Sequence, residues 1–276
     1  MLKSTTHQPF IASYAKDFPW LRFLLRSFAT FSGAERGLSR SFAPPVVCTN
    51  PEDAAAAMIL CQEVYPTARV VVGAGSPGYL RAQVCMMSSD LFCPWADYLY
   101  FFGSDCFVTA DVDPVEAYFK YGKPLMLVNS YRHLLEGGDN VQPWWEGTSA
   151  ALGFNVEYEC MRRLPLVYPA HVLKGVRGYL EFHHKMPFDH YIYDTIAADG
   201  EQYHSKFSEA NVIGSWARAF SSSSFTWLDL DKPRNADRVP PSPVRQFWSH
   251  GGIDRPDDRD GRTPRSVFEE VLGAPL

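Results

Sequence analysis

The sequence lacks several features that would place it in a class of protein at once. It has no apolar run close to the ~20 residues of a membrane-spanning helix, and no signal peptide opens it, so we expect a cytoplasmic protein without a transmembrane segment. Its six cysteines show no C-x-x-C spacing, which argues against a zinc site and a disulfide framework. The net charge of −5 gives no overall attraction to nucleic acid or anionic lipid.

Two common nucleotide-binding signatures are also missing at the positions where such enzymes carry them. No G-x-G-x-x-G follows the first predicted strand, which weakens the case for a dinucleotide-binding dehydrogenase. No G-x-x-x-x-G-K-[ST] occurs anywhere, which weakens the case for a P-loop enzyme. The glycines at Gly73 and Gly75 end the third predicted strand, so we interpret that stretch as a turn.

What the sequence does contain is an alternation of strand and helix patterns over its first half. The predicted strands are 9–12, 45–48, 69–72, 98–102 and 124–128, and the predicted helices are 18–31, 53–64, 79–92 and 116–121. This βαβ spacing predicts an α/β protein with a mainly parallel sheet flanked by helices. The second half is more helical, with helices predicted at 172–184, 188–198, 208–220 and near the C-terminus.

The chain is organised around residues 96–114, ADYLYFFGSDCFVTADVDP. An aromatic, apolar run, 98–102, is typical of a buried strand, and it breaks at Gly103-Ser104-Asp105. A carboxylate at the end of a buried strand needs a partner, and ligands bind at the carboxyl ends of strands in open α/β sheets. A metal–diphosphate group would serve as that partner; the alternative is that Asp105 only caps a turn.

Four stretches resemble GT-A-type glycosyltransferases, in particular a poorly characterised bacterial and viral group of glycosyltransferase-like proteins. They are Ser13-Tyr14-x-x-Asp17, Gly78-Tyr79-Leu80-Arg81-x-Gln83, Gly103-Ser104-Asp105, and Phe207-Ser208-Glu209 followed by Trp248-Ser249-His250-Gly251. The resemblance covers most of residues 8–252. The family usually carries Asp-Ser-Asp where this chain has Gly103, and a lysine where it has Met86, so one carboxylate and one cation are absent.

The resemblance implies a GT-A-like, Rossmann-related fold and a metal-assisted transfer, most simply of a hexose, from a nucleotide-diphosphate sugar to an acceptor hydroxyl. A UDP-sugar is the first donor to consider, with Mn²⁺ or Mg²⁺ as the divalent metal. It also implies a nucleotide-sugar-binding half at 1–135 and an acceptor-side half at 136–252 that completes the same domain. Residues 253–276 form a charged C-terminal tail in this interpretation.

The same resemblance assigns roles to individual residues. Those implied in nucleotide-sugar binding are Ser13, Tyr14, Asp17, Arg81, Gln83, Ser104, Asp105 and Gly251. Asp105 and His250 are the implied metal ligands, and Glu209 is the implied general base. Simpler interpretations stay open, because Asp17 and Glu209 both stand where a helix begins and His250 suits a surface turn.

The acceptor and the competing functions are less defined. A basic group of residues would suit a phosphorylated acceptor or would simply be solvated: Arg162, Arg163, Lys174, Arg177, His183, His184 and Lys185. An acceptor glycan, a lipid-linked sugar or a hydroxymethylated base in phage DNA fits this description. A non-catalytic nucleotide-sugar- or glycan-binding module is the alternative from another class. A nucleotidyltransferase would need a second carboxylate near Asp105 for two metals, and Asp111 and Asp113 lie on the exit loop.

The pair Trp144-Trp145 is predicted to lie in a loop of the second half. Two adjacent indoles there would form a stacking wall for a ligand or fill a gap in the core. Three acidic residues of the following helical region, Asp189, Asp194 and Asp199, are alternatives to Glu209 as the reacting carboxylate.

Overall fold

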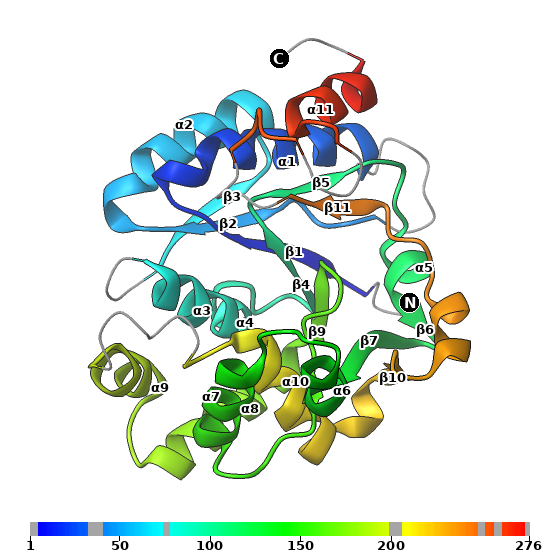
Figure 1. Cartoon of the computed structure of the whole chain (residues 1–276). Coiled ribbons are helices and arrows are strands. Elements are labelled where there is room, and N and C mark those ends of the chain that lie inside the picture. Colours follow the sequence, from blue (N-terminus) through cyan, green and yellow to red (C-terminus); the bar gives the residue numbers. More distant parts are fainter. Residues whose placement is uncertain are drawn as a thin grey trace.

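The chain forms a five-stranded sheet with helices on both faces (Figure 1). The computed structural model describes residues 5–32, 41–73, 78–198, 206–247, 252–256 and 261–273. The sheet has the order β3-β2-β1-β4-β9 and consists of Arg69–Val72, Val46–Thr49, His7–Ala12, Tyr98–Gly103 and Leu166–Pro169. Strands β1 to β4 run parallel, and β9 is antiparallel to β4. The predicted mainly parallel α/β sheet is confirmed.

The two faces of the sheet bury two separate sets of apolar side chains. Along β4, Leu99 and Phe101 point into one core and Tyr100 and Phe102 into the other, because successive side chains of a strand alternate between faces. All four are essentially inaccessible to solvent. A strand covered on both faces is therefore apolar throughout, which is why this run was recognisable in the sequence.

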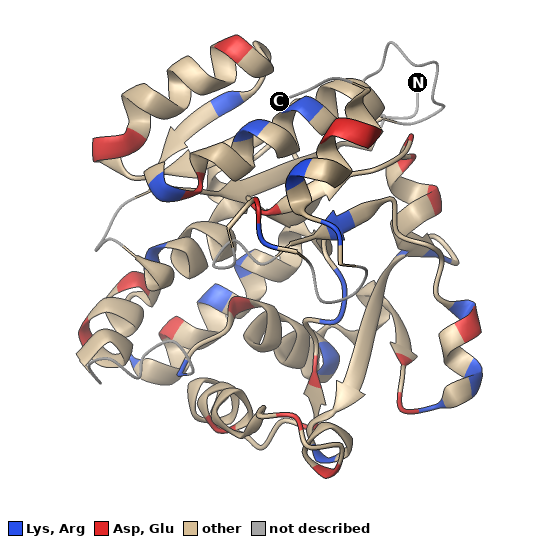
Figure 2. Ribbon diagram, turned by 45° about the horizontal axis from the view of Figure 1, so that its top comes forward, with Lys and Arg blue, Asp and Glu red and all other residues tan. Residues whose placement is uncertain are grey.

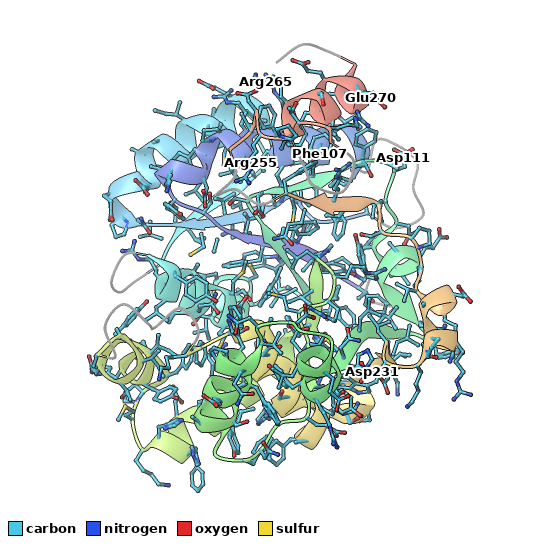
Figure 3. All side chains as sticks on the ribbon, viewed as in Figure 1. Phe107, Asp111, Asp231, Arg255, Arg265 and Glu270 are labelled. Atoms are coloured by element: carbon cyan, nitrogen blue, oxygen red, sulfur yellow. The ribbon has the colours of Figure 1, made fainter. Side chains whose placement is uncertain are left out.

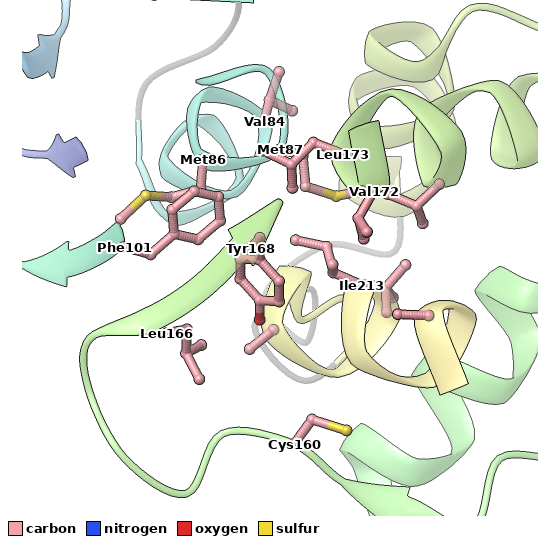
Figure 4. Close-up of a cluster of buried hydrophobic side chains, with 14 of the residues drawn as sticks. Val84, Met86, Met87, Phe101, Cys160, Leu166, Tyr168, Val172, Leu173 and Ile213 are labelled. Atoms are coloured by element: carbon pink, nitrogen blue, oxygen red, sulfur yellow. The ribbon is translucent and has the colours of Figure 1, made fainter. Parts of the chain in front are cut away.

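Different helices cover the two faces. Helices α1 (Phe18–Phe31) and α2 (Ala54–Val64) contribute to the core that holds Tyr100. On the other face lie α3 (Tyr79–Met87), α4 (Ser89–Phe92), α8 (Ala170–His184) and α10 (Glu209–Phe220). Figure 4 shows that second core, where Tyr168 of β9 lies among side chains from α3, α8 and α10; its ring meets Phe101 edge to face, 5.0 Å between centroids.

A second sheet continues from the first half into the second. Its order is β10-β7-β6, with β8 also paired to β7, and its strands are Thr226–Asp229, Lys123–Ser130, Phe119–Lys120 and Tyr158–Glu159. Helices α5 (Pro114–Tyr118), α6 (Tyr131–Glu136) and α7 (Gln142–Leu152) lie along this part of the chain. The predicted halves 1–135 and 136–252 thus share both sheets, since β9 completes the first and β8 and β10 complete the second.

The prediction of a loop at Trp144-Trp145 is wrong, because both residues lie in α7. The Trp145 indole N–H donates to the carbonyl of Val156 at 2.7 Å, and its ring stacks on Tyr131 with centroids 5.7 Å apart. The pair therefore belongs to the core of the second half, which was the other interpretation of these tryptophans.

Several predicted helices also differ in their ends. The helix predicted at 79–92 is divided at Ser88 into α3 and α4, and the one predicted at 116–121 ends at Tyr118, where the chain turns into β6. The helix predicted at 188–198 consists of α9 (Phe188–His190) followed by a π-helical stretch to Ile196. Helices α1, α2, α8 and α10 agree with the prediction to within two residues.

The C-terminal part of the chain returns to the first half. Strand β11 (Val244–Gln246) pairs antiparallel with β5 (Cys106–Val108), which lies within the central stretch 96–114 of the sequence. The charged segment ends in α11 (Pro264–Leu272), which packs on α1 through Phe268. Figure 3 shows Arg265 and Glu270 on this helix and Phe107 of β5 below it. Among the described residues, no helix has the length and apolar character to span a membrane.

Candidate functional site

The candidate site begins where the order of the strands reverses. The chain places β2 and β3 on one side of β1 and then returns to place β4 on the other, so the carboxyl ends of β1 and β4 flank a topological switch point. Ala12 is in register with Gly103, which brings the residues after the two strands together. The Ser104 hydroxyl donates a long hydrogen bond to the Asp17 carboxylate, 3.4 Å from Oγ to Oδ2.

A small cavity lies beside this point, at the ends of β1 and β2. Its volume is about 20 Å³, and it is lined by Ala12, Ser13, Tyr14, Cys48, Thr49, Asn50, Gly78, Arg81, Ala82 and Cys85. Three of the residues predicted to bind a nucleotide-sugar, Ser13, Tyr14 and Arg81, therefore share one cavity. The volume suits a water molecule, so any larger ligand would have to lie across the mouth of the cavity or widen it.

The cavity wall carries buried polar groups. The Ser13 and Thr49 hydroxyls are buried and have no hydrogen-bond partner within the described part of the chain. The Arg81 side chain is 5% exposed, and its Nη1 lies 3.8 Å from the exposed carboxylate of Glu52. Buried hydroxyls without partners cost free energy, and a ligand or a water molecule that reached them would recover it.

The rim of the cavity comes from the segment after β1. Tyr14 is 38% exposed, so its ring is available for stacking. Asp17 occupies the N-cap position of α1, but its side chain makes no capping hydrogen bond. Asp17 thus stands at the start of α1, as its simpler interpretation expects, and its bond from Ser104 also turns the carboxylate toward the end of β4.

Asp105 faces the C-terminal strand β11. Its Oδ1 lies 3.5 Å from the Gln246 side-chain amide, and its backbone carbonyl accepts from the Phe247 N–H at 2.9 Å. A Cβ atom at Gly103 would lie 2.5 Å from the same Oδ1, so the carboxylate occupies the space beside the glycine. The other predicted metal ligand, His250, and the predicted donor contact Gly251 lie outside the described residues.

The described residues hold no group of three or more His, Cys, Asp or Glu side chains that would bind a metal ion on its own. One carboxylate is nevertheless enough for Mg²⁺ or Mn²⁺ when substrate phosphates and water supply the other ligands. Asp105 fits that kind of site.

Glu209 is the first residue of α10, as predicted, and Ser208 caps the helix by accepting from the Asn211 N–H. The Glu209 backbone N–H donates to the Gln83 side-chain oxygen at 2.8 Å, so α3 and α10 are joined at this point. Burial raises the Glu209 pKa to about 7, although hydrogen bonds from its own and the Ala210 backbone and from Gln83 oppose the shift. A carboxyl group with such a pKa exchanges protons near neutral pH.

Two residues of α3 thus serve different parts of the site. Arg81 lines the cavity at the strand ends, whereas Gln83 contacts the start of α10. The structure therefore places Gln83 next to the predicted general base. Tyr79 and Tyr168 also lie close enough for the Glu209 charge to add to the burial that raises their pKa values.

Protein groups hold several of the other predicted polar residues. Arg177 forms an ion pair with Asp90, Arg162 pairs with Glu159, and the Arg163 guanidinium donates to two backbone carbonyls. Three members of the predicted basic group thus stabilise the fold, and basic and acidic residues are interspersed along the ribbon (Figure 2). Asp194 pairs with His190 on an exposed surface, and Asp199 lies outside the described residues.

Sequence patterns did not single out four residues of the cavity, Cys48, Thr49, Asn50 and Cys85. The Asn50 side chain donates to the Asp53 carboxylate and makes no capping hydrogen bond with the following helix. The available signal was position, since Thr49 and Asn50 end β2 next to β1, and parallel strands end at the same edge. The contact of Cys85 with this edge depends on how α3 packs, which no local pattern reveals.

The chain matches no protein-family model and no curated protein sequence. The geometry defines an α/β protein with a mainly parallel sheet and a small polar cavity at its switch point. The residues at this edge of the sheet are the basis for the function proposed below.

Proposed function

We propose that this protein is a GT-A-like glycosyltransferase that moves a sugar from a nucleotide-diphosphate donor to an acceptor hydroxyl. The observation that supports it most is the meeting of two predicted donor-binding stretches at the switch point, where Ser104 after β4 bonds Asp17 after β1. Open α/β sheets bind nucleotides at such points.

The donor would lie along the ends of β1, β2 and β4. Tyr14 would stack on the base at the mouth of the cavity, and Asp17 would accept from a ribose hydroxyl or a base N–H. Arg81, behind them, places a positive charge near the phosphates, and guanidinium groups bind phosphate oxygens in pairs. A UDP-sugar remains the first donor to test.

A divalent metal would meet the donor diphosphate at Asp105. Mg²⁺ or Mn²⁺ would neutralise charge on the leaving diphosphate, with Asp105 and the phosphate oxygens among its ligands. The role of Asp105 is to fix the position of that charge at the end of β4. Gln246 and the Phe247 backbone hold the residue from the C-terminal side.

Glu209 would act as the general base. Its carboxylate takes the proton from the acceptor hydroxyl as the hydroxyl oxygen attacks the anomeric carbon of the sugar. The bond from that carbon to the diphosphate oxygen breaks, and its electron pair leaves with the diphosphate. Gln83 and the first N–H groups of α10 hold the carboxylate in place.

The deciding experiment incubates the protein with a panel of nucleotide-sugars, with and without Mn²⁺, and measures nucleotide release. Metal-dependent release supports the transferase. Tight binding without release supports the alternative, a non-catalytic nucleotide-sugar-binding module, for which the absence of a carboxylate at Gly103 is the specific argument. No binding of any donor rejects both. Acceptor glycans, lipid-linked sugars and hydroxymethylated DNA then serve as the second panel.

The first prediction concerns Asp105→Asn. Nucleotide diphosphate binding in Mn²⁺ should weaken by about tenfold or more, because losing a carboxylate ~4 Å from a cation forfeits up to a few kcal/mol at an effective dielectric of 20. The melting temperature of the ligand-free protein should change little. Titration calorimetry measures the affinity, and the exposed Asp237→Asn is the matched control. Equal binding by both variants, unaffected by a chelator, contradicts the metal role of Asp105.

A further inference from the structure

Two thiols of the candidate cavity lie against each other. Cys48 at the end of β2 and Cys85 on α3 both line the cavity, and they are 1% and 3% exposed. A Cβ atom built on Gly73 would lie 2.2 Å from the Cys85 sulfur and 3.1 Å from the Cys48 sulfur. Both sulfur atoms therefore lie next to Gly73, and the missing side chain of the glycine leaves space for them.

Electrostatics make the two thiols unequal. Cys48 S–H donates to the Cys85 sulfur, and this bond, with help from the Arg81 guanidinium, lowers the Cys85 pKa although burial opposes it. The same bond and burial raise the Cys48 pKa. The thiolate is the reactive form of cysteine, and Arg81, which lines the same cavity one helical turn before Cys85, carries the positive charge that stabilises it; this favours Cys85 as the nucleophile and Cys48 as the resolving thiol.

We propose that Cys48 and Cys85 form a redox-modification site whose oxidant is a small peroxide. The Cys85 thiolate attacks one peroxide oxygen, the O–O bond breaks, and protonation of the leaving oxygen gives one water and a sulfenic acid. Cys48 then attacks the sulfenic sulfur and releases the second water as the disulfide forms. Two thiols and one hydrogen peroxide are thereby converted to one disulfide and two waters.

The size of the cavity selects the oxidant. A volume of about 20 Å³ admits a molecule close to water in size, and hydrogen peroxide meets that limit. A disulfide reagent such as oxidised glutathione is far larger and would have to displace the wall. We therefore expect peroxide to act much faster on this pair than oxidised glutathione does.

Oxidation would also change the polar wall. Arg81 precedes Cys85 by one helical turn, so the two side chains lie on the same face of α3. A disulfide from Cys85 to Cys48 of β2 would therefore constrain the face of the helix that carries the guanidinium. The consequence for donor binding rests on the proposed function, whereas formation of the disulfide does not.

The test treats the intact protein with a few equivalents of hydrogen peroxide, blocks the remaining thiols, and maps cross-linked peptides by mass spectrometry. The free-thiol count of the denatured protein should fall by two from six, with one cross-link joining Cys48 to Cys85 and reversal by a reductant. A cross-link to the neighbouring Cys93, or no cross-link under conditions that oxidise other cysteines, overturns the proposal.

Two variants test the order of events. Cys48→Ser should accumulate a sulfenic acid on Cys85 that a dimedone probe traps, whereas Cys85→Ser should leave Cys48 unlabelled; the opposite pattern overturns the assigned roles. Cys61→Ser, which alters a buried thiol of the other core, is the matched control and should form the cross-link normally. If the cross-link forms and nucleotide affinity is unchanged, the redox site stands and the proposed donor site loses support.

Discussion

At the scale of single residues, Glu209 couples the chemistry of the site to the stability of the fold. Burial raises its pKa to about 7, whereas in the unfolded chain the carboxyl group titrates near 4.5. Between these values the folded protein keeps a proton that the unfolded chain has released. The contribution of Glu209 to stability is therefore complete below about pH 4.5 and is lost as the pH rises to about 7.

The second prediction follows from this window. In Glu209→Gln the fall in the free energy of unfolding from pH 4.5 to 7 should be smaller than in the parent by roughly 1–3 kcal/mol. Urea denaturation at several pH values measures it. Glu116→Gln, in the first turn of α5 but exposed, should keep the parental slope. Parallel slopes in all three proteins would contradict the raised pKa.

The same group predicts a pH dependence of transfer. If Glu209 is the base, the rate should rise as the pH passes through about 7, because only the carboxylate accepts the proton. Glu209→Gln should bind donor like the parent but turn over ~10²–10⁴-fold more slowly. Turnover by this variant at the parental rate excludes the base role.

The third prediction concerns the close approach at Gly73. Gly73→Ala should destabilise the fold by about 1–3 kcal/mol, because its Cβ would overlap the Cys85 sulfur and the site is closely packed. Thermal or urea denaturation gives the size of the loss. Cys85→Ala in the same chain removes the sulfur and should restore part of it, whereas Gly178→Ala meets no atom within 4 Å and should cost nothing. If the stability losses of Gly73→Ala and Cys85→Ala simply add in the double variant, the overlap between the new Cβ and the Cys85 sulfur is contradicted.

At the scale of elements, α11 holds the strand beside Asp105. Phe268 packs on Phe23 and Phe107 with ring centroids 4.4 Å apart in both cases, and it also contacts Phe247 edge to face. Phe247 follows β11, and its backbone N–H donates to Asp105. A helix far from the cavity in sequence thus fixes the residue that is proposed to hold the metal.

The fourth prediction tests this connection. Phe268→Ala should remove up to about 3–5 kcal/mol of packing free energy, and α11 with β11 should exchange their amide hydrogens faster than the five-stranded sheet does. Donor affinity should fall with it. Glu270→Ala, on the exposed side of the same helix, should leave both unchanged, since exposed ion pairs contribute little. Unaltered exchange in β11 of Phe268→Ala would show that α11 does not support the strand.

Elements differ in how well the sequence predicts them, for physical reasons. Strands β2 and β4 could be recognised because burial on both faces makes them almost continuously apolar. The edge strand β3 is partly exposed and was recognised by its run of valines, and Ser208 indicated the start of α10 through its capping chemistry. The Trp144-Trp145 helix was missed because tertiary packing on Tyr131 outweighs modest helix propensity. The pairing of β5 with β11 joins segments more than 130 residues apart, and short strands leave no local sign of such a partner.

In the candidate site, too, some contacts could be predicted from the sequence and others depend on tertiary packing. Ser13, Asp17 and Ser104 could be placed together because adjacent strands end at one edge. The contact between Cys48 and Cys85 depends on the rotation of α3 against the sheet, so it became visible only in three dimensions.

At the scale of the whole molecule, both predicted halves contribute to one core. The cluster around Tyr168 contains residues from β1 and α3 as well as from α8 and α10. The fifth prediction is that the chain unfolds in a single cooperative transition, with coincident curves from tryptophan fluorescence and far-ultraviolet circular dichroism. A fragment of residues 1–135 should not fold alone, because it lacks β9. Two separated transitions would contradict this.

The packing of α11 on α1 has a consequence for biosynthesis. Helix α1 leaves the ribosome before the C-terminal segment, yet the residues that pack on its outer apolar side, with Trp20 and Phe23, include Phe247 and Phe268 of that segment. At about 5–20 residues per second, more than ten seconds separate the emergence of the two helices. During that interval the nascent chain presents an uncovered aromatic surface, so we expect it to be prone to aggregation until translation reaches α11.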